Sequence, residues 1–266
     1  MATITQFKKF SDAKKLLSDL FEIPHSVLFI HYSCESFYDR SDGSSPRITS
    51  IAVRFLGSGQ TKSFSIHQEA ELKNISTSDI MQHYDELERS MLDNFASFCA
   101  RYSACKWVHW NMRDGNYGFE AIAHRHRVLG GSPCDLQDTN KIDLARLFHD
   151  YLGPKYIAHP RFQRLLERND MIPRNFLPGK DEADAFARQE YVKLHQSTLS
   201  KVDTLSNLAE YAAEDRLKCD NDYFKRRGIN LKTTGSIIKD HPIFVAISVI
   251  AVLFALVANA LKIFGP

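Results

Sequence analysis

The chain has 266 residues, of which 25% are charged and 44% are apolar, which is the ordinary balance of a folded globular protein. The net charge of +2 does not by itself indicate a nucleic-acid-binding protein, and the composition excludes a disordered or collagen-like chain. The five cysteines form no zinc-binding pattern, so we expect a reduced domain without structural disulfides.

The spacing of apolar residues in the first part of the chain predicts one helix followed by three strands. Apolar residues recur at helical spacing in residues 1–22, and Pro24 interrupts that pattern. Three strand-like runs follow, and the short connection Gly57–Gln60 between the second and third favours a hairpin. These runs are Ser26–Tyr32, Arg47–Leu56 and Lys62–His67.

The middle of the chain alternates between helices and strands. The pattern predicts a helix at Asp79–Tyr102, a strand at Lys106–Trp110, a helix at Phe119–Leu129 and a weak fifth strand at Asp135–Thr139. Helices then dominate, at about 142–152, 160–168, 181–196 and 204–227. This order predicts an α/β fold in which helices flank a mixed sheet.

A long apolar segment near the C-terminus indicates a membrane anchor. From Ile243 to Leu261 only Ser248 and Asn259 are not apolar. A helix of this length spans roughly 28 Å, which is close to the hydrocarbon thickness of a bilayer. A buried core helix, the alternative, would need a polar face, and this segment has none. We therefore predict one transmembrane helix at residues 243–263.

The flanks of that segment predict its orientation. Residues 216–241 carry seven Lys or Arg against three Asp, and only Lys262 follows the segment. This bias places the N-terminal domain in the cytoplasm of a single-pass protein, and the N-terminus carries no apolar signal sequence. The expected organisation is an N-terminal helix (1–25), a main domain (26–230), a basic juxtamembrane linker (231–242) and the transmembrane helix.

Two acidic residues are candidates for a functional site. Glu35 follows the first predicted strand, and strand ends commonly build the active sites of α/β proteins; an exposed loop residue is the alternative. Asp215 interrupts the apolar stripe of the last predicted helix, with Tyr211 four residues earlier on the same side. A buried carboxylate needs a partner or a metal, whereas a helix N-terminal position or a surface salt bridge would explain Asp215 without one.

The segment from Tyr211 to Asp215 (YAAED) resembles the third motif, Tyr-x-x-x-Asp, of the DEDD superfamily of 3′–5′ exonucleases. These enzymes have an RNase H-like fold and are similar to the proofreading domains of DNA polymerases. By this resemblance, the segment from Ser33 to Glu35 corresponds to the first motif, Asp-x-Glu, and Asn111 through Asn116 to the second. The resemblance covers about residues 26–227.

The resemblance implies a phosphodiester hydrolase that uses two Mg²⁺ or Mn²⁺ ions. It assigns Glu35 and Asp215 as catalytic metal ligands, with Asp114 as the candidate third ligand, and Tyr211 as the residue that orients water. It further implies that Asn111 and Asn116 contact the substrate, the 3′ end of a DNA or RNA strand. We expect the carboxylates of Glu35 and Asp215 to lie within about 8 Å of each other.

The sequence departs from the family at two carboxylate positions. Ser33 replaces the first Asp, and Asn116 replaces the Asp of the second motif. Two negative charges are therefore missing from a site that must offset about four positive ones. One interpretation is a membrane-anchored exonuclease-like protein that acts on or binds nucleic acid with weakened catalysis. The other is a catalytically dead pseudo-nuclease that serves as a binding, scaffold or sensing module at the membrane.

Overall fold

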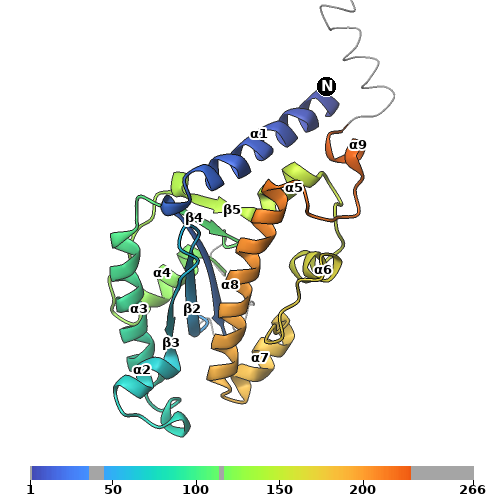
Figure 1. Cartoon of the computed structure of the whole chain (residues 1–266). Helices are drawn as coiled ribbons and strands as arrows, with labels where there is room; N and C mark the ends of the chain where they lie inside the picture. The colour runs from blue at the N-terminus through green and yellow to red at the C-terminus, as the bar shows by residue number, and fades with distance from the viewer. Residues whose placement is uncertain (1, 36–44, 114–116, 229–266) are drawn as a thin grey trace, which may run out of the picture.

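The computed structural model describes residues 2–35, 45–113 and 117–228, and its centre is a five-stranded mixed sheet (Figure 1). The strand order is β3-β2-β1-β4-β5. β2 pairs antiparallel with β1 and β3, whereas β4 pairs parallel with β1 and β5. The predicted α/β class with a mixed sheet is confirmed. The strands are β1 (Val27–Cys34), β2 (Ile48–Phe55), β3 (Thr61–Ser65), β4 (Lys106–His109) and β5 (Lys141–Asp143).

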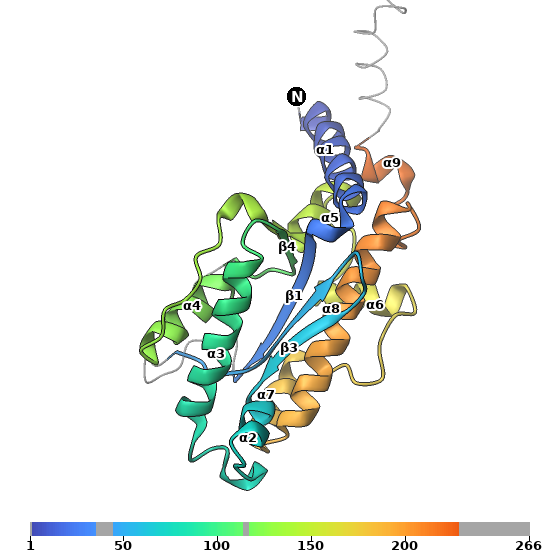
Figure 2. The ribbon, with the colours of Figure 1, turned by 60° about the vertical axis from the view of Figure 1, so that its left-hand side comes forward.

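The central strand β1 is buried along its whole length, because helices cover both faces of the sheet (Figure 2). Side chains alternate between the faces along a strand. Leu28 and Ile30 therefore pack towards α3 (Tyr84–Arg101) and α4 (Phe119–Val128). Val27 and Phe29 pack towards the opposite layer of helices.

The opposite layer contains α8 (Tyr191–Ala213), α5 (Leu144–Leu152) and the N-terminal helix α1 (Ala2–Glu22). Helix α1 contributes Phe10, Leu17 and Leu20 to the same core that α8 and β1 build. The predicted N-terminal helix therefore packs on the main domain.

Shorter helices complete the described part of the chain. Helix α2 follows β3 directly and packs with α7 and the start of α8 in a third apolar cluster. Helix α6 precedes α7 along the chain, and α9 follows α8. Their bounds are α2 (Ile66–Leu72), α6 (Arg161–Arg168), α7 (Gly179–Ala187) and α9 (Tyr223–Arg226).

Several predicted elements differ from the structure in place or length; the helix expected at Asp79–Tyr102, for example, is α3 and begins at Tyr84. The fifth strand pairs with β4 at Lys141–Asp143 and not at Asp135–Thr139, because a 3-10 turn at Asp138–Asn140 precedes it. The predicted strand Lys62–His67 ends at Ser65, where the missed helix α2 begins. The predicted helix 181–196 is two helices, which separate at Gln189, where the backbone turns to a φ of 59°.

The last large helix also differs from the prediction of 204–227. Helix α8 begins at Tyr191, because its buried stripe already includes Leu194 and Val202. It ends at Ala213, so Asp215 lies beyond its last turn.

No helix of the described ranges is long and apolar enough to cross a bilayer. The predicted transmembrane segment Ile243–Leu261 and the linker at 231–242 lie outside the residues that the structure describes. Asp114 and Asn116 lie outside them as well.

Candidate functional site

A buried polar cluster lies at the carboxyl end of β1, on the face that α8 covers. Ser33 is completely buried, and its hydroxyl donates a hydrogen bond of 2.8 Å to Oε1 of Glu182 in α7. Oγ1 of Thr198 in α8 lies 2.7 Å from Ser33 Oγ and 2.7 Å from Ser50 Oγ in β2. We call these four residues, with Lys201 of α8, the Ser33 cluster.

The charge of the Ser33 cluster is balanced by its own residues. Lys201 Nζ lies 2.8 Å from Glu182 Oε1, and both side chains are almost fully buried. The same ammonium lies 5.2 Å from the ring centroid of Phe176, which adds a cation–π contact. Because a buried charge is stable only when it is paired, the lysine and the glutamate depend on each other.

His31, two residues before Ser33 on the same face of β1, adds no positive charge at neutral pH. Burial and the nearby ammonium of Lys201 both lower the pKa of His31 well below its usual value. The imidazole is therefore neutral at pH 7.

The donors at this place do not fit a pair of divalent cations. Two-metal sites for phosphodiester hydrolysis need several carboxylates to offset the charge of the ions. The Ser33 cluster offers one carboxylate and three hydroxyls, and its Lys201 ammonium would repel a cation. Over the part of the chain that the structure describes, no group of three or more His, Cys, Asp or Glu side chains could hold a metal ion.

Glu35 lies just beyond β1, at the same end of the sheet as the Ser33 cluster. Its backbone N–H donates to the carbonyl of Arg47 at 2.8 Å, and the Arg47 N–H donates to Glu35 Oε2 at 3.4 Å. Glu35 therefore continues the β1–β2 ladder by one residue pair, with a partly buried side chain.

Asp215 lies beyond the opposite end of α8, two residues after Ala213, where it contacts α1 and α5. Figure 1 shows this end of α8 beside those two helices. Its carboxylate accepts hydrogen bonds from the Lys14 ammonium of α1 and the Tyr151 hydroxyl of α5. Partial burial raises the pKa of Asp215, but these two hydrogen bonds outweigh it and bring the pKa below its usual value. The exposed, paired carboxylate stabilises a contact between helices.

The expected convergence of Glu35 and Asp215 is therefore not met. Thr198 contacts the Ser33 hydroxyl at one end of α8, and roughly 22 Å of helix separates Thr198 from Ala213 at 1.5 Å per residue. The two carboxylates lie at opposite ends of the sheet and cannot share a pair of metal ions.

The position of Asp215 has a local backbone explanation. Its φ is 56°, its N–H donates to the carbonyl of Ala212, and the N–H of Arg216 donates to the carbonyl of Tyr211. This is a Schellman ending, in which the residue after the helix adopts the left-handed conformation that Gly, Asn and Asp tolerate best. The guanidinium of Arg216 lies 4.0 Å from the ring centroid of Tyr211. Tyr211 thus belongs to the end of the helix, away from Glu35.

Asn111 forms the turn after β4 with a φ of 55°. Its N–H donates to Asp143 Oδ1 at 3.0 Å, and its own Oδ1 accepts from Arg113 at 2.8 Å. Asp143 also caps α5 by accepting from the N–H of Ala145. Asn111 is therefore placed at the carboxyl end of the parallel strands β4 and β5, where it lines a pocket that is rich in arginine.

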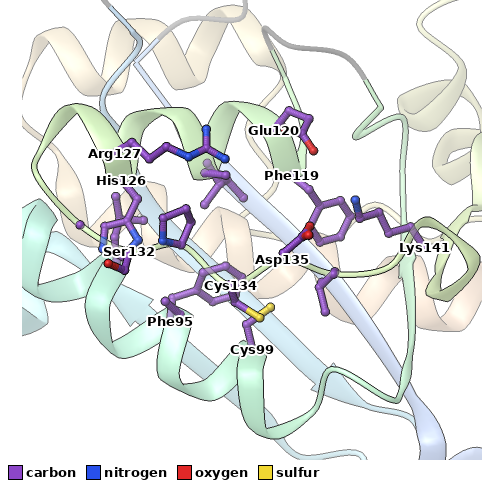
Figure 3. Close-up of a pocket in the computed structure, with 17 residues that line it drawn as sticks. Phe95, Cys99, Phe119, Glu120, His126, Arg127, Ser132, Cys134, Asp135 and Lys141 are labelled. Carbon is purple, nitrogen blue, oxygen red and sulfur yellow. The ribbon is translucent and has the colours of Figure 1, made fainter.

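A different pocket, of about 480 Å³, lies between α3, α4 and the loop after α4 (Figure 3). Its charged lining residues have mixed signs, as Glu120 and Arg127 illustrate. His126 is held by Asp93, 2.8 Å from Nε2 to Oδ1, and burial together with the neighbouring Cys134 raises the pKa of the Cys99 thiol. That thiol stays protonated, so Cys99 is a poor nucleophile.

The sequence pattern does not predict Glu182, Thr198 and Lys201 as members of the cluster around Ser33. They lie about 150 or more positions away along the chain, so no local motif joins them. One signal was available, because Thr198 and Lys201 are three residues apart and interrupt the apolar stripe of α8 between Leu194 and Leu205.

Comparison with known proteins identifies no relative: no family model, no curated protein and no solved structure matches this chain.

Proposed function

We propose that this chain is a nuclease-like module that binds nucleic acid or nucleotides without cleaving them, and that its C-terminal segment anchors it to a membrane. In this proposal the fold is RNase H-like. A mixed sheet with helices on both faces is compatible with that fold, and α8 crosses the end of β1 where the resemblance puts the catalytic centre.

The Ser33 cluster is the observation that carries this proposal. Ser33 stands at the position that the resemblance assigns to a metal-bridging Asp, and it is hydrogen-bonded to Glu182 instead. The ammonium of Lys201 already neutralises that carboxylate. A divalent cation entering here would have to displace a buried ion pair and would find one carboxylate, so the chemistry of two-metal hydrolysis is not supported.

The position of Asp215 argues against an active exonuclease, and it leaves the resemblance without its third motif at the end of β1. Hydrolysis by the family's mechanism needs the carboxylate of the third motif beside that of the first. Asp215 is held instead by Lys14 and Tyr151, at the far end of α8 from Ser33. Glu35 then remains as the one carboxylate of the predicted metal site at the end of β1 within the described ranges.

A cleavage assay tests the proposal. The full chain is incubated with 3′-labelled single-stranded DNA or RNA and Mn²⁺, beside Ser33→Asp/Asn116→Asp and Glu35→Gln. We expect intact substrate with all three proteins, because restoring two carboxylates leaves Lys201 and the distance to Asp215 unchanged. Stepwise Mn²⁺-dependent shortening by the unmodified chain that Glu35→Gln abolishes would contradict the proposal.

A further inference from the structure

A basic pocket of about 440 Å³ lies at the carboxyl ends of β4 and β5, between the start of α5 and the start of α6. Open α/β sheets bind ligands at the carboxyl ends of their strands. Three arginines line the pocket, and no Asp or Glu is among its described lining residues. These arginines are Arg113, Arg146 and Arg161.

The positive charge of this pocket is only partly neutralised. Arg113 forms an ion pair with Asp143. Arg146 makes no ion pair or hydrogen bond with any residue in the described ranges, and Nε of Arg161 is buried without a hydrogen-bond acceptor there. Two guanidinium groups therefore have donors left for an anion, and the planar arginine fork matches the oxygens of a phosphate.

One wall of the pocket is aromatic. The ring centroids of Trp110 and Phe162 lie 5.1 Å apart, and their planes meet at 49°. Both rings are only partly buried, so they remain available for stacking. Arginines beside an aromatic surface are the combination that binds nucleotides, because the phosphate pairs with guanidinium and the base stacks on a ring.

We propose that this pocket binds a nucleotide, with its phosphate at Arg146 and Arg161 and its base against Trp110 and Phe162. The choice of a nucleotide rests on the proposed function. The arginines and the aromatic pair of the pocket by themselves favour any ligand in which an anion is attached to a planar ring. The ligand is either a free nucleotide or the terminal nucleotide of a single strand. The pocket is separate from the Ser33 cluster and binds its ligand without a metal.

The chain contains its own reporter for this site. It has two tryptophans, of which Trp107 is completely buried in the core beneath α3, while Trp110 lines the pocket. The full chain is titrated with AMP, adenosine and inorganic phosphate while tryptophan fluorescence is recorded. We expect a saturable change with AMP and at least tenfold weaker binding of adenosine and of phosphate. Phosphate binding as tightly as AMP would overturn the proposal.

Substitutions locate the binding. Arg146→Glu and Arg161→Met should each weaken AMP binding at least tenfold. Arg101→Glu, a matched charge reversal at the exposed end of α3, should leave it unchanged. In Trp110→Phe the fluorescence response should disappear. Wild-type affinity in Arg146→Glu, or a response that persists in Trp110→Phe, would overturn the proposal.

Competition separates the ligand sources and the two proposals. Displacement of AMP by a short oligoadenylate indicates the end of a nucleic acid, and no displacement indicates a free nucleotide. Vesicles of anionic phospholipid that bind through Arg146 and are not displaced by AMP would overturn the nucleotide proposal. Cleavage of the oligoadenylate would contradict the proposed function alone, and intact oligoadenylate bound equally by Arg146→Glu would contradict the pocket alone.

Discussion

Lys201 Nζ lies 2.8 Å from Glu182 Oε1 in the interior of the domain, where one side chain is 6% and the other 1% exposed. This pair joins α7 to α8 beneath the end of β1, next to Ser33. In our account the Lys201 ammonium takes the place of the positive charge that a metal ion brings to the site of an active nuclease. The pair should therefore matter for stability and not for catalysis.

Lys201→Met is predicted to lower the free energy of unfolding by about 3–5 kcal/mol, because it leaves the Glu182 carboxylate buried without a counter-charge. Lys201→Met/Glu182→Gln should recover part of this loss. Chemical denaturation measures both.

Lys193→Met is the matched control for Lys201→Met. Lys193 lies on the same helix and pairs with Glu190 at 3.2 Å, but its side chain is 50% exposed. A surface pair of this kind contributes less than about 1 kcal/mol. If Lys201→Met cost no more than Lys193→Met, the buried pair would not have the role we assign to it.

The sheet could be predicted because its strands are marked by local signals. Apolar runs such as Val27–Ile30 and the hairpin turn at Gly57–Gln60 specify β1, β2 and β3 from neighbouring residues alone. The strand β5 could not be placed this way. It is three residues long, and its position depends on pairing with β4, which lies more than 30 residues earlier.

The candidate site was harder to predict than the fold. The sequence pattern predicts that Asp215 is a polar break in a buried stripe. Asp also tolerates the left-handed conformation that follows a helix, and the end of α8 at Ala213 places Asp215 in this second role. The partners of Ser33 come from α7 and α8, so only the packing of those helices on β1 brings them together.

Asp215→Asn is predicted to lower the free energy of unfolding by about 0.5–1 kcal/mol and to leave AMP and oligonucleotide binding unchanged. Asn tolerates the left-handed conformation, so the substitution removes mainly the ion pair with Lys14, which is largely exposed. Thermal unfolding and binding titrations test this. A loss of nucleic-acid binding without a loss of stability would favour a site role for Asp215.

Acidification below pH 6.5 is predicted to destabilise the domain through His195. Burial, together with the neighbouring His67, lowers the pKa of His195 to about 4. Between pH 6.5 and pH 4 the unfolded chain binds a proton at His195 and the folded chain does not, so the free energy of unfolding falls as the pH falls. Glu88 acts in the opposite sense, because burial, opposed by Arg125, raises its pKa to about 7.

His195→Gln isolates the histidine contribution. Between pH 6.5 and pH 4.5 this variant should lose about 2 kcal/mol less stability than the unmodified chain. His83→Gln is the control, since the His83 side chain is 46% exposed. If the free energy of unfolding depended on pH equally in His195→Gln and in the unmodified chain, the pKa of His195 would not be lowered in the folded state, and the prediction would be wrong.

The C-terminal segment is predicted to be the membrane anchor, because 17 of the 19 residues from Ile243 to Leu261 are apolar. The full chain should resist alkaline extraction from membranes, and a chain ending at Gly235 should be soluble. A shortened chain that still sediments with lipid after washing in high salt would contradict this prediction.

A titration of the full chain with Mn²⁺ tests the central claim most directly, with free Mn²⁺ followed by its electron paramagnetic resonance signal. We predict that the unmodified chain takes up no stoichiometric Mn²⁺ at the end of β1, because Lys201 already neutralises Glu182. Glu35→Gln and Glu182→Gln should therefore leave the titration unchanged. Uptake of one or two ions per chain that either substitution abolishes would contradict the account and restore the metal-dependent nuclease.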